Sequence, residues 1–258
     1  MKGVLRYLNP KKLNNLGRTA LGILFPPVCP LCEKVLLPAD HGKCCGACSK
    51  KIRPAEGAMC YKCGKLLQSA EKELCDNCRK RNFHFKRNFT VYPYEAEIRQ
   101  LITGLKYEGK KYIGEFFARE TIKTYGEKLE SLGFDAVIPI PIHKSRMKKR
   151  GYNQAEVYAG VLAEELNIPM YPYILYRSRH TKAQKNLDTA ERMSNLMDAF
   201  AVDRSELERA ERKGKLKRVL LADDICTTGS TLECASLRLL ESGIEEVYCI
   251  CISGTREI

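Results

Sequence analysis

The sequence predicts an α/β fold in which a parallel sheet is covered by helices on both faces and follows a small metal-binding module. Short apolar runs alternate with amphipathic helical patterns over most of the chain after residue 90. One of these runs leads directly into paired acids and a stretch of small hydroxyl residues. Four Cys-x-x-Cys pairs crowd into residues 29–78, ahead of the predicted sheet.

Charge is unevenly distributed along the 258 residues. Residues 1–90 carry 18 Lys and Arg against 6 Asp and Glu, whereas residues 91–258 carry 26 against 25. A basic amino-terminal part attracts polyanions such as nucleic acid, or it simply provides a hydrated surface, and composition leaves both open. No apolar run approaches the ~20 residues of a membrane-spanning helix, so no transmembrane segment is expected.

The patterns divide the chain into three parts. Residues 1–28 are expected to form an amphipathic helix, because "LGRTALGILF" lacks the small-residue cleavage site of a secretory signal. This helix packs on the protein or serves a membrane surface or a partner. Residues 29–80 form the metal-binding module, and residues 81–258 form the α/β domain.

The cysteine pairs predict two structural zinc ions. A Cys-x-x-Cys turn presents two thiolates to one ion, and two turns complete a tetrahedral cage. Disulfides suit exported chains, and iron–sulfur clusters fit the regular paired spacing less well. The expected ligands are Cys29, Cys32, Cys45, Cys48, Cys60, Cys63, Cys75 and Cys78.

Spacing alone leaves the pairing of the four turns open. Sequential cages join the first turn to the second and the third to the fourth, and a crossed arrangement joins the first to the third; the sequential one is simpler. Cys44 is expected to be a spare thiol beside Cys45, and the alternative is that it substitutes as a ligand. Large apolar residues are few here, so the metal should stabilise the module.

The segment "KRNFHFKRNF" (residues 80–89) mixes cations with aromatic rings. Such a segment can stack single-stranded bases while its cations meet phosphates. The alternative is a linker whose phenylalanines dock onto the following domain, and this alternative is favoured.

The α/β domain is expected to contain strands and helices in alternation. "TVYPY" is strand-like and precedes a helical stripe of Ile98, Leu101, Ile102 and Leu105. Further helices are predicted at residues 112–129, 153–168 and 229–242, and further strands at 135–143, 170–178, 218–225 and 245–254. Four cysteines in these elements are expected to be small core residues: Cys226, Cys234, Cys249 and Cys251.

The stretch "RVLLADDICTTGSTL" (residues 218–232) predicts a ligand site at the carboxyl end of a buried strand. Carboxylates accept hydrogen bonds from vicinal hydroxyls, and a hydroxyl-rich loop at a helix N-terminus suits a phosphate. A ribose phosphate has both groups. Two alternatives are a simple helix cap and a magnesium site at the two acids. Neither explains why an apolar strand, two acids and a run of hydroxyl residues follow one another in this order.

These residues resemble the ComF family. "VLLADDICTTGST" is similar to the binding motif of type I phosphoribosyltransferases for 5-phosphoribosyl 1-pyrophosphate (PRPP). The order of "LKYEGKKY", "IPIPIHKSRMKKRGYNQA" and "HTKAQKNLDTAERMSNLMDAF" also resembles this family, from about residue 21 onward. The resemblance implies a type I phosphoribosyltransferase-like sheet, zinc ribbons and a cytoplasmic protein that supports DNA uptake in natural competence.

The resemblance also implies roles for individual residues. Asp223 and Asp224 would hold the ribose diol and act in catalysis. The 5′-phosphate would be bound by Thr227, Thr228, Gly229, Ser230 and Thr231. Candidates for the pyrophosphate or for a closing loop are His143, Lys144, Arg146, Arg150, Gln184 and Arg192. Mg²⁺ would accompany PRPP.

Two functions remain open at the level of sequence. One is an enzyme that transfers the phosphoribosyl group to an acceptor that the sequence does not name. The other is a non-catalytic accessory factor that uses the PRPP pocket for sensing or stability. Its partners would be single-stranded DNA and competence proteins such as a helicase.

Overall fold

The computed structural model describes residues 26–37, 40, 44–177 and 199–257. The chain divides into two compact units, Met1–Ile52 and Arg53–Ile258, which are described separately. Most of the helix expected in residues 1–28 lies outside the described residues. The candidate loop residues Gln184 and Arg192 also lie outside them.

The larger unit is built on a four-stranded sheet, which confirms the predicted α/β class. The strand order is β1 (Asn88–Pro93), β6 (Glu246–Gly254), β5 (Arg218–Cys226) and β2 (Ala136–Pro139). Every neighbouring pair of these strands is parallel. Val, Ile, Leu and Cys fill the central strands because both faces of the sheet are covered.

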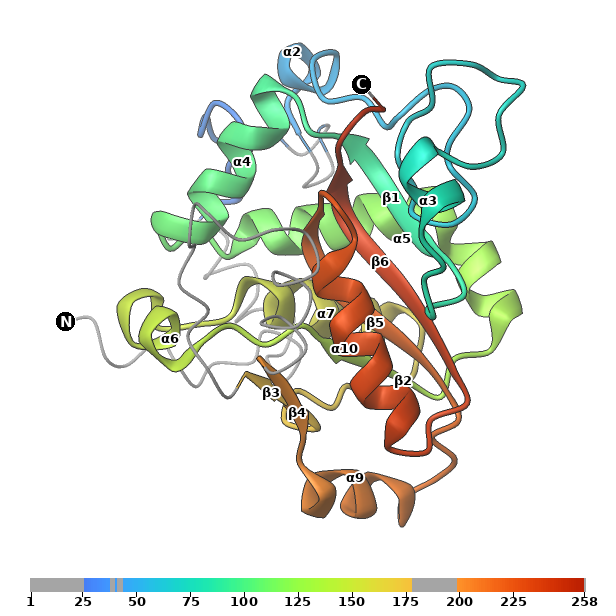
Figure 1. Cartoon of the computed structure of the whole chain (residues 1–258). Coiled ribbons are helices and arrows are strands. Elements are labelled where there is room, and N and C mark those ends of the chain that lie inside the picture. The colour runs from blue at the N-terminus through green and yellow to red at the C-terminus, as the bar shows by residue number, and fades with distance from the viewer. Residues whose placement is uncertain (1–25, 38–39, 41–43, 178–198, 258) are drawn as a thin grey trace, which may run out of the picture. The chain divides into compact units, whose positions relative to one another are not determined.

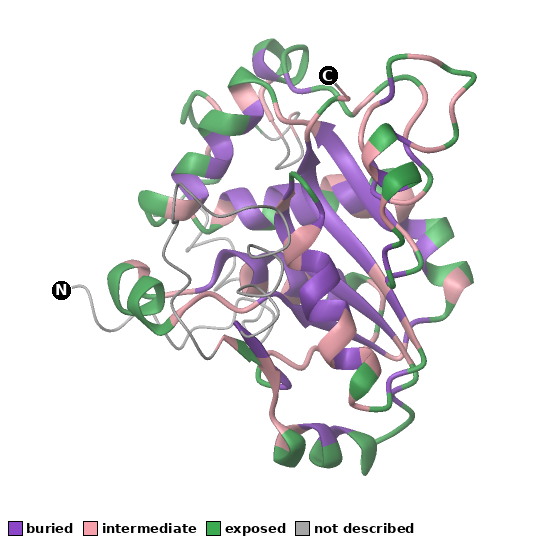
Figure 2. Ribbon diagram, in the orientation of Figure 1, coloured by how far each residue is buried: buried purple, intermediate pink, exposed green. Residues whose placement is uncertain are grey.

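Helices cover the two faces (Figures 1 and 2). On one face lie α4 (Ala96–Tyr107), α5 (Tyr112–Leu132) and α7 (Gln154–Glu165). On the other lies α10 (Ser230–Glu241), whose Leu232, Ala235 and Leu239 join the core formed by alternate residues of β5. Because β5 lies between β6 and β2, the connection from β5 to α10 begins at an interior strand of the sheet.

Two segments differ from the sequence prediction. Residues 144–150, for which the sequence predicted neither a helix nor a strand, form a helix, α6 (Lys144–Arg150), which His143 caps by accepting a hydrogen bond from Ser145 N. In the described residues 170–177 of the expected strand, Met170 bridges to Val137 of the main sheet, and Tyr171 N donates to Val137 O. The next hydrogen bond of that ladder would come from the backbone N–H of residue 139, and Pro139 has none.

A two-stranded antiparallel sheet takes up the rest of that predicted strand. It pairs β3 (Leu175–Arg177) with β4 (Phe200–Val202). The following helix, α9 (Arg204–Glu211), begins at Asp203, whose carboxylate accepts hydrogen bonds from Ser205 N and Glu206 N.

The second pair of cysteine turns belongs to the larger unit. It includes a short helix, α3 (Asp76–Lys80), and its cysteines join the main core. Phe83, Phe85 and Phe89 are at most 3% exposed, so they dock onto the domain and cannot stack bases. Cys226, Cys234, Cys249 and Cys251 are buried, as expected.

The smaller unit contains the first pair of turns and a short helix, α2 (Gly46–Ser49). Its described core is only Cys29, Leu36 and Cys48, with a few half-buried neighbours. So small a core stabilises a fold weakly unless a metal adds to it. In the described part of the chain, no helix combines the length and apolar character needed to cross a membrane.

Candidate functional site

The site begins where β2 ends beside β5. Pro139, the last residue of β2, pairs with Ala222 of β5. Ile140 N then donates the last hydrogen bond, to Ala222 O. Asp223 and Asp224 come next on β5, so the side of the strand facing β2 is open from this point. Ligands of open α/β sheets bind at such positions, beyond the carboxyl end of a strand.

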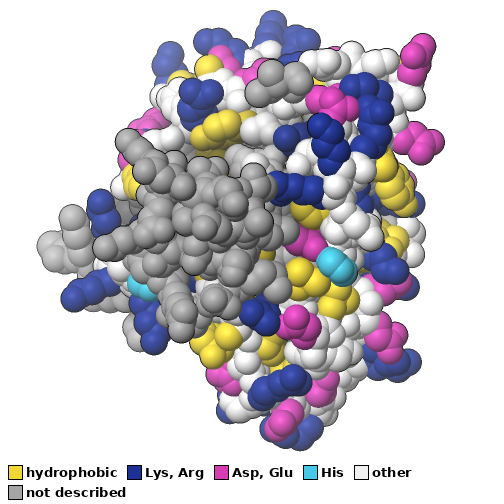
Figure 3. Space-filling model, in the orientation of Figure 1, with side chains coloured by type: hydrophobic (Ala, Val, Ile, Leu, Met, Phe, Trp, Pro, Cys, Tyr) yellow, Lys and Arg dark blue, Asp and Glu magenta, His cyan; other side chains and the backbone are white. Residues whose placement is uncertain are grey.

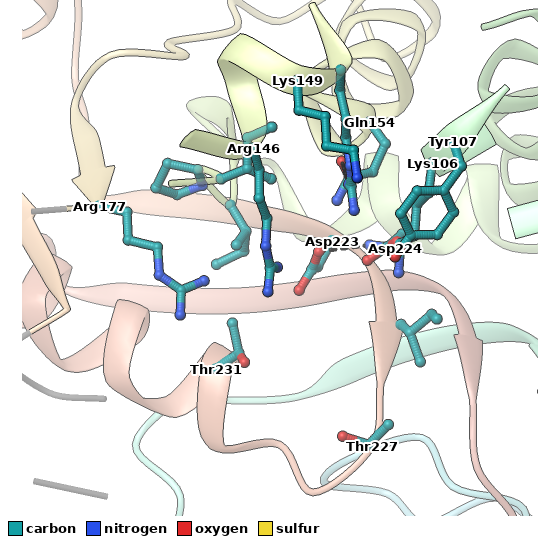
Figure 4. Close-up of a pocket in the computed structure, with 15 residues that line it drawn as sticks. Lys106, Tyr107, Arg146, Lys149, Gln154, Arg177, Asp223, Asp224, Thr227 and Thr231 are labelled. Atoms are coloured by element: carbon teal, nitrogen blue, oxygen red, sulfur yellow. Dashed lines mark hydrogen bonds and ion pairs between the residues drawn. The ribbon is translucent and has the colours of Figure 1, made fainter. Parts of the chain in front are cut away.

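A cavity of about 450 Å³ occupies this opening (Figure 4). Two acids and five cations line it, together with hydroxyl, amide and apolar groups. The cations are Lys106, Arg146, Lys149, Arg150 and Arg177. A cavity with a surplus of positive charge around two carboxylates suits a ligand that carries both anionic groups and hydroxyls.

The two acids face opposite sides of the sheet, because side chains alternate along a strand. Asp223 shares its face with Val219 and Leu221, which pack with α10. Asp224 shares the other face with α4 and forms an ion pair with Lys106. Burial first, and the adjacent charge of Asp224 second, raise the pKa of Asp223 well above its ordinary value.

The loop between β5 and α10 (residues 227–229) supplies hydroxyls and a helix N-terminus. Thr227 and Thr231 line the cavity, whereas Thr228, Gly229 and Ser230 are not among the described residues that line it. The hydroxyls of Thr228 and Ser230 lie 3.0 Å apart. Gly229 precedes the helix with φ +79°, a left-handed conformation that glycine adopts at little cost. The first N–H groups of α10 then attract anions.

Helix α6 and strand β3 provide the cations on the opposite side of the cavity. Arg146 and Lys149 come from α6, and Arg177 comes from β3 (Figure 4). Arg150 is the last residue of α6 and also lines the cavity. Burial, followed by the nearby charge of Arg146, lowers the pKa of Arg177. A bound anion would relieve this crowding of guanidinium groups.

Two sequence candidates from the same segment lie elsewhere. His143 and Lys144 are not among the described residues that line the cavity. The His143 ring caps α6 through Ser145, and Lys144 is exposed. Of the six candidates for the pyrophosphate or a closing loop, the structure therefore brings Arg146 and Arg150 to the cavity.

The segment "RGYNQ" (residues 150–154) holds the cavity walls together. The Tyr152 hydroxyl donates to Leu105 O in α4. Asn153 caps α7 by accepting from Ala155 N, and its amide donates to Ile140 O, just after β2. Arg150 donates to the Gln154 side chain at 2.7 Å and lies over the Tyr107 ring. These contacts position α4, α6 and the end of β2 around one cavity.

Sequence reasoning assigned no role to four of the cationic and aromatic residues that line the cavity. These are Lys106, Tyr107, Lys149 and Arg177. Lys106 and Tyr107 belong to "LKYEGKKY", a motif that could have pointed to them. Nothing in the local sequence distinguishes Arg177 from an ordinary basic residue at the end of a strand.

The cysteines form two clusters of four, and the pairing is sequential. One contains Cys29, Cys32, Cys45 and Cys48, and the other Cys60, Cys63, Cys75 and Cys78. Within each cluster the four sulfur atoms lie within 4.8 Å of one another. Zn–S bonds of about 2.3 Å in a tetrahedron require such separations. Both clusters therefore fit zinc, and the crossed pairing is wrong.

The second cluster is tied closely to the sheet. Its knuckle residue Gly64 has φ +71°, and a Cβ there would lie 2.6 Å from the Thr90 hydroxyl of β1. The Asn88 side chain donates to Cys63 O at 2.8 Å. Lys and Arg side chains gather on this part of the surface in Figure 3. Arg79 and Lys80 of α3 are exposed.

Comparison with known proteins agrees with both parts of the chain. Residues 20–79 match the double zinc ribbon domain, and residues 153–257 match the phosphoribosyl transferase domain. Competence protein F of Haemophilus influenzae is 35% identical over 154 residues, which cover 57% of this chain and 63% of that protein. Competence protein ComFC of Bacillus subtilis is 28% identical over 158 residues, covering 61% and 60%. The chain thus spans less than two thirds of these two relatives.

A longer alignment joins the chain to DNA utilization protein YhgH of Escherichia coli. The identity is 27% over 227 residues, which cover 86% of this chain and 83% of that protein. Among solved structures, the purine phosphoribosyltransferase from Pyrococcus horikoshii aligns with 53% of this chain and 72% of its own. At a TM-score of 0.33 and 21% identity, that likeness is too low to support an argument.

Proposed function

This chain is a ComF-family protein that carries a double zinc ribbon followed by a phosphoribosyl transferase domain, and we propose that it binds PRPP in the cavity beside Asp223 and Asp224. The observation that carries the proposal is the open side of β5 beyond Ala222. There, two buried acids, a hydroxyl loop and five cations line one cavity. PRPP has a diol, a phosphate monoester and a pyrophosphate, one group for each of these three features.

Each feature takes one part of the ligand in this proposal. Asp223 and Asp224 accept hydrogen bonds from the ribose 2′- and 3′-hydroxyls. The loop of residues 227–229 and the first turn of α10 hold the 5′-phosphate. Arg146 and Arg150 face the pyrophosphate, together with a Mg²⁺ ion that the ligand brings.

The same arrangement supports phosphoribosyl transfer. The bond between C1 and the pyrophosphate oxygen breaks, an acceptor nucleophile bonds to C1, and negative charge builds on the departing pyrophosphate. Arg146, Lys149 and Arg150 are placed to stabilise that charge, as preorganised cations do in other transfer reactions. A PRPP-binding accessory factor would use the same contacts without the transfer.

The names of the relatives support a role in the uptake or use of DNA. In this role, single-stranded DNA and competence proteins such as a helicase would be partners. The eight zinc thiolates favour a reducing compartment, and we place the protein in the cytoplasm.

Calorimetric titration with PRPP, with and without Mg²⁺, tests the proposal. Saturable binding by the wild type is expected, and the double variant Asp223→Asn/Asp224→Asn should lose it. Release of pyrophosphate that depends on an added acceptor would identify an enzyme. A well-folded wild type that binds no PRPP under either condition would refute the proposed ligand.

The DNA role has its own test. Binding of a single-stranded oligonucleotide should weaken steeply as salt rises, since phosphate contacts release counterions. The Asp223→Asn/Asp224→Asn variant should retain this binding, because the acids contribute no attraction to a polyanion. Wild-type protein that binds no oligonucleotide at low salt would leave the DNA role without a direct contact.

A further inference from the structure

Three carbonyl groups around the β5–α10 loop are held from the side of the second zinc ribbon and the chain's last strand. Thr255 N donates to Cys226 O at 3.3 Å, and the Thr255 hydroxyl donates to Thr227 O at 3.4 Å. The Asn77 side-chain amide donates to Thr228 O at 3.2 Å. Since a peptide plane carries C=O and N–H on opposite sides, these bonds fix how the loop presents its N–H groups.

Phe83 packs against the next residue of the loop. A Cβ on Gly229 would lie 3.2 and 3.3 Å from two atoms of the Phe83 ring. The ring is 3% exposed and stacks on Phe85 with centroids 5.1 Å apart. Phe83 thus closes the space behind the left-handed glycine at the start of α10.

The second zinc cluster determines where Asn77 lies. Asn77 is in α3, between the cluster residues Cys75 and Cys78. Helix α3 has five residues, far fewer than an isolated helix needs for stability in water. Thiolates bonded to one ion at both ends of this stretch would hold the helix, and with it the Asn77 amide, in place.

The end of the chain links the ribbon to the loop a second time. The Glu257 carboxylate accepts a hydrogen bond from Asp76 N at 2.9 Å and pairs with Lys72. Glu257 N donates to Leu66 O at 2.9 Å. Thr255, two residues earlier, is the donor to the loop. The ribbon therefore contacts the loop directly and also holds the segment that supports it.

We propose that the second zinc ribbon is a working part of the 5′-phosphate site, with Asn77 as a positioning residue for the loop that binds the phosphate. This inference rests on the proposed function, because it assumes that the loop receives the phosphate monoester of a ribose. It assigns a binding task to a module that would otherwise only stabilise the fold. Zinc in the second cluster then controls affinity for the phosphate end of the ligand, and the α6 side of the cavity does not depend on it.

Ribose 5-phosphate and inorganic pyrophosphate separate the two ends of the site in calorimetric titrations. Asn77→Ala is expected to weaken ribose 5-phosphate binding about 3- to 10-fold, the usual effect of losing one hydrogen bond. Pyrophosphate affinity and the content of two zinc ions per chain should not change. Arg79 lies on the same helix, and in the described contacts its side chain pairs only with Asp76. The control variant Arg79→Ala should therefore bind both ligands as the wild type does.

The possible outcomes distinguish this inference from the proposed function. Failure of the wild type to bind ribose 5-phosphate would refute the proposed ligand and the inference together. Wild-type binding that Asn77→Ala retains in full would overturn the positioning role alone. An equal loss of both ligands in Asn77→Ala would also overturn it, since a general weakening of the fold affects both ends of the cavity.

Discussion

Lys106 of α4 forms an ion pair with Asp224 of β5, inside the cavity and next to Asp223. The side chains of Lys106 and Asp224 are 19% and 7% exposed, so the pair is largely removed from water. The pair gives the Asp224 carboxyl group a cationic partner, whereas burial and the charge of its neighbour raise the pKa of Asp223. Two adjacent carboxyl groups thus have different electrostatic surroundings before any ligand binds.

Removal of Lys106 should destabilise the protein. Lys106→Ala leaves Asp224 buried without its cation, and we expect a loss of about 1–3 kcal/mol in the free energy of unfolding. Urea denaturation at pH 7.5 measures it. The matched control is Lys110→Ala, whose pair with the half-exposed Glu108 should contribute less than about 1 kcal/mol. Equal losses in the two variants would show that the buried Lys106–Asp224 pair contributes no more to the free energy of unfolding than the more exposed Lys110–Glu108 pair.

Asp223→Asn should stabilise the fold and abolish PRPP binding. The pKa of Asp223 is raised in the folded protein, so its ionisation opposes folding increasingly as pH rises above the unfolded value of about 4. An asparagine has no such cost, and its oxygen can still accept from Asp224 N. At pH 8 we expect a gain of about 1 kcal/mol or more, since one pKa unit corresponds to about 1.4 kcal/mol.

The pH profile is the decisive measurement for this variant. Melting temperatures of wild type and Asp223→Asn should diverge as pH rises, until the folded-state pKa of Asp223 is passed. Zinc content should be measured at each pH, because acid releases metal from thiolates. A difference that is flat with pH, or that grows toward acid, would contradict the assignment.

Local patterns in the sequence were sufficient for much of the fold and for part of the site. The alternation of apolar runs predicted the parallel sheet, and the Cys-x-x-Cys spacing predicted two cages whose sequential pairing the structure confirms. The order of strand, acids and hydroxyl loop pointed to β5 and α10. All of these signals lie within short stretches of the chain.

The cations of the cavity were harder to predict, because tertiary structure brings them together. Lys106 and Arg177 come from α4 and β3, far from Asp223 along the chain. Helix α6 was missed because none of its residues is buried, so it has no apolar stripe. The sequence therefore treated Lys144 and Arg146 alike, although of these two residues only Arg146 lines the cavity.

The adjacent residues Cys44 and Cys45 should differ in their effect on zinc binding by the first cluster. Cys45 is a member of the cluster, whereas Cys44 lies beside it with its sulfur 3.5 Å from that of Cys29. Cys45→Ser should reduce the zinc content from two ions to one per chain, and Cys44→Ser should retain two. Elemental analysis of purified protein measures both. A loss of zinc from Cys44→Ser would mean that Cys44 is a ligand.

Arg146 and Lys144 provide the test of the cationic side of the cavity. Arg146→Ala removes a guanidinium that lines the cavity, and we expect PRPP and pyrophosphate affinity to fall about 10-fold or more, the effect of a lost charged hydrogen bond. Ribose 5-phosphate should be affected less, because its phosphate lies at the β5–α10 loop. Lys144→Ala removes an exposed cation of the same helix and should change each affinity less than about 2-fold, by weakening only the general positive field. Equal losses in both variants would mean that α6 acts through that general field, and that Arg146 has no specific contact with the pyrophosphate.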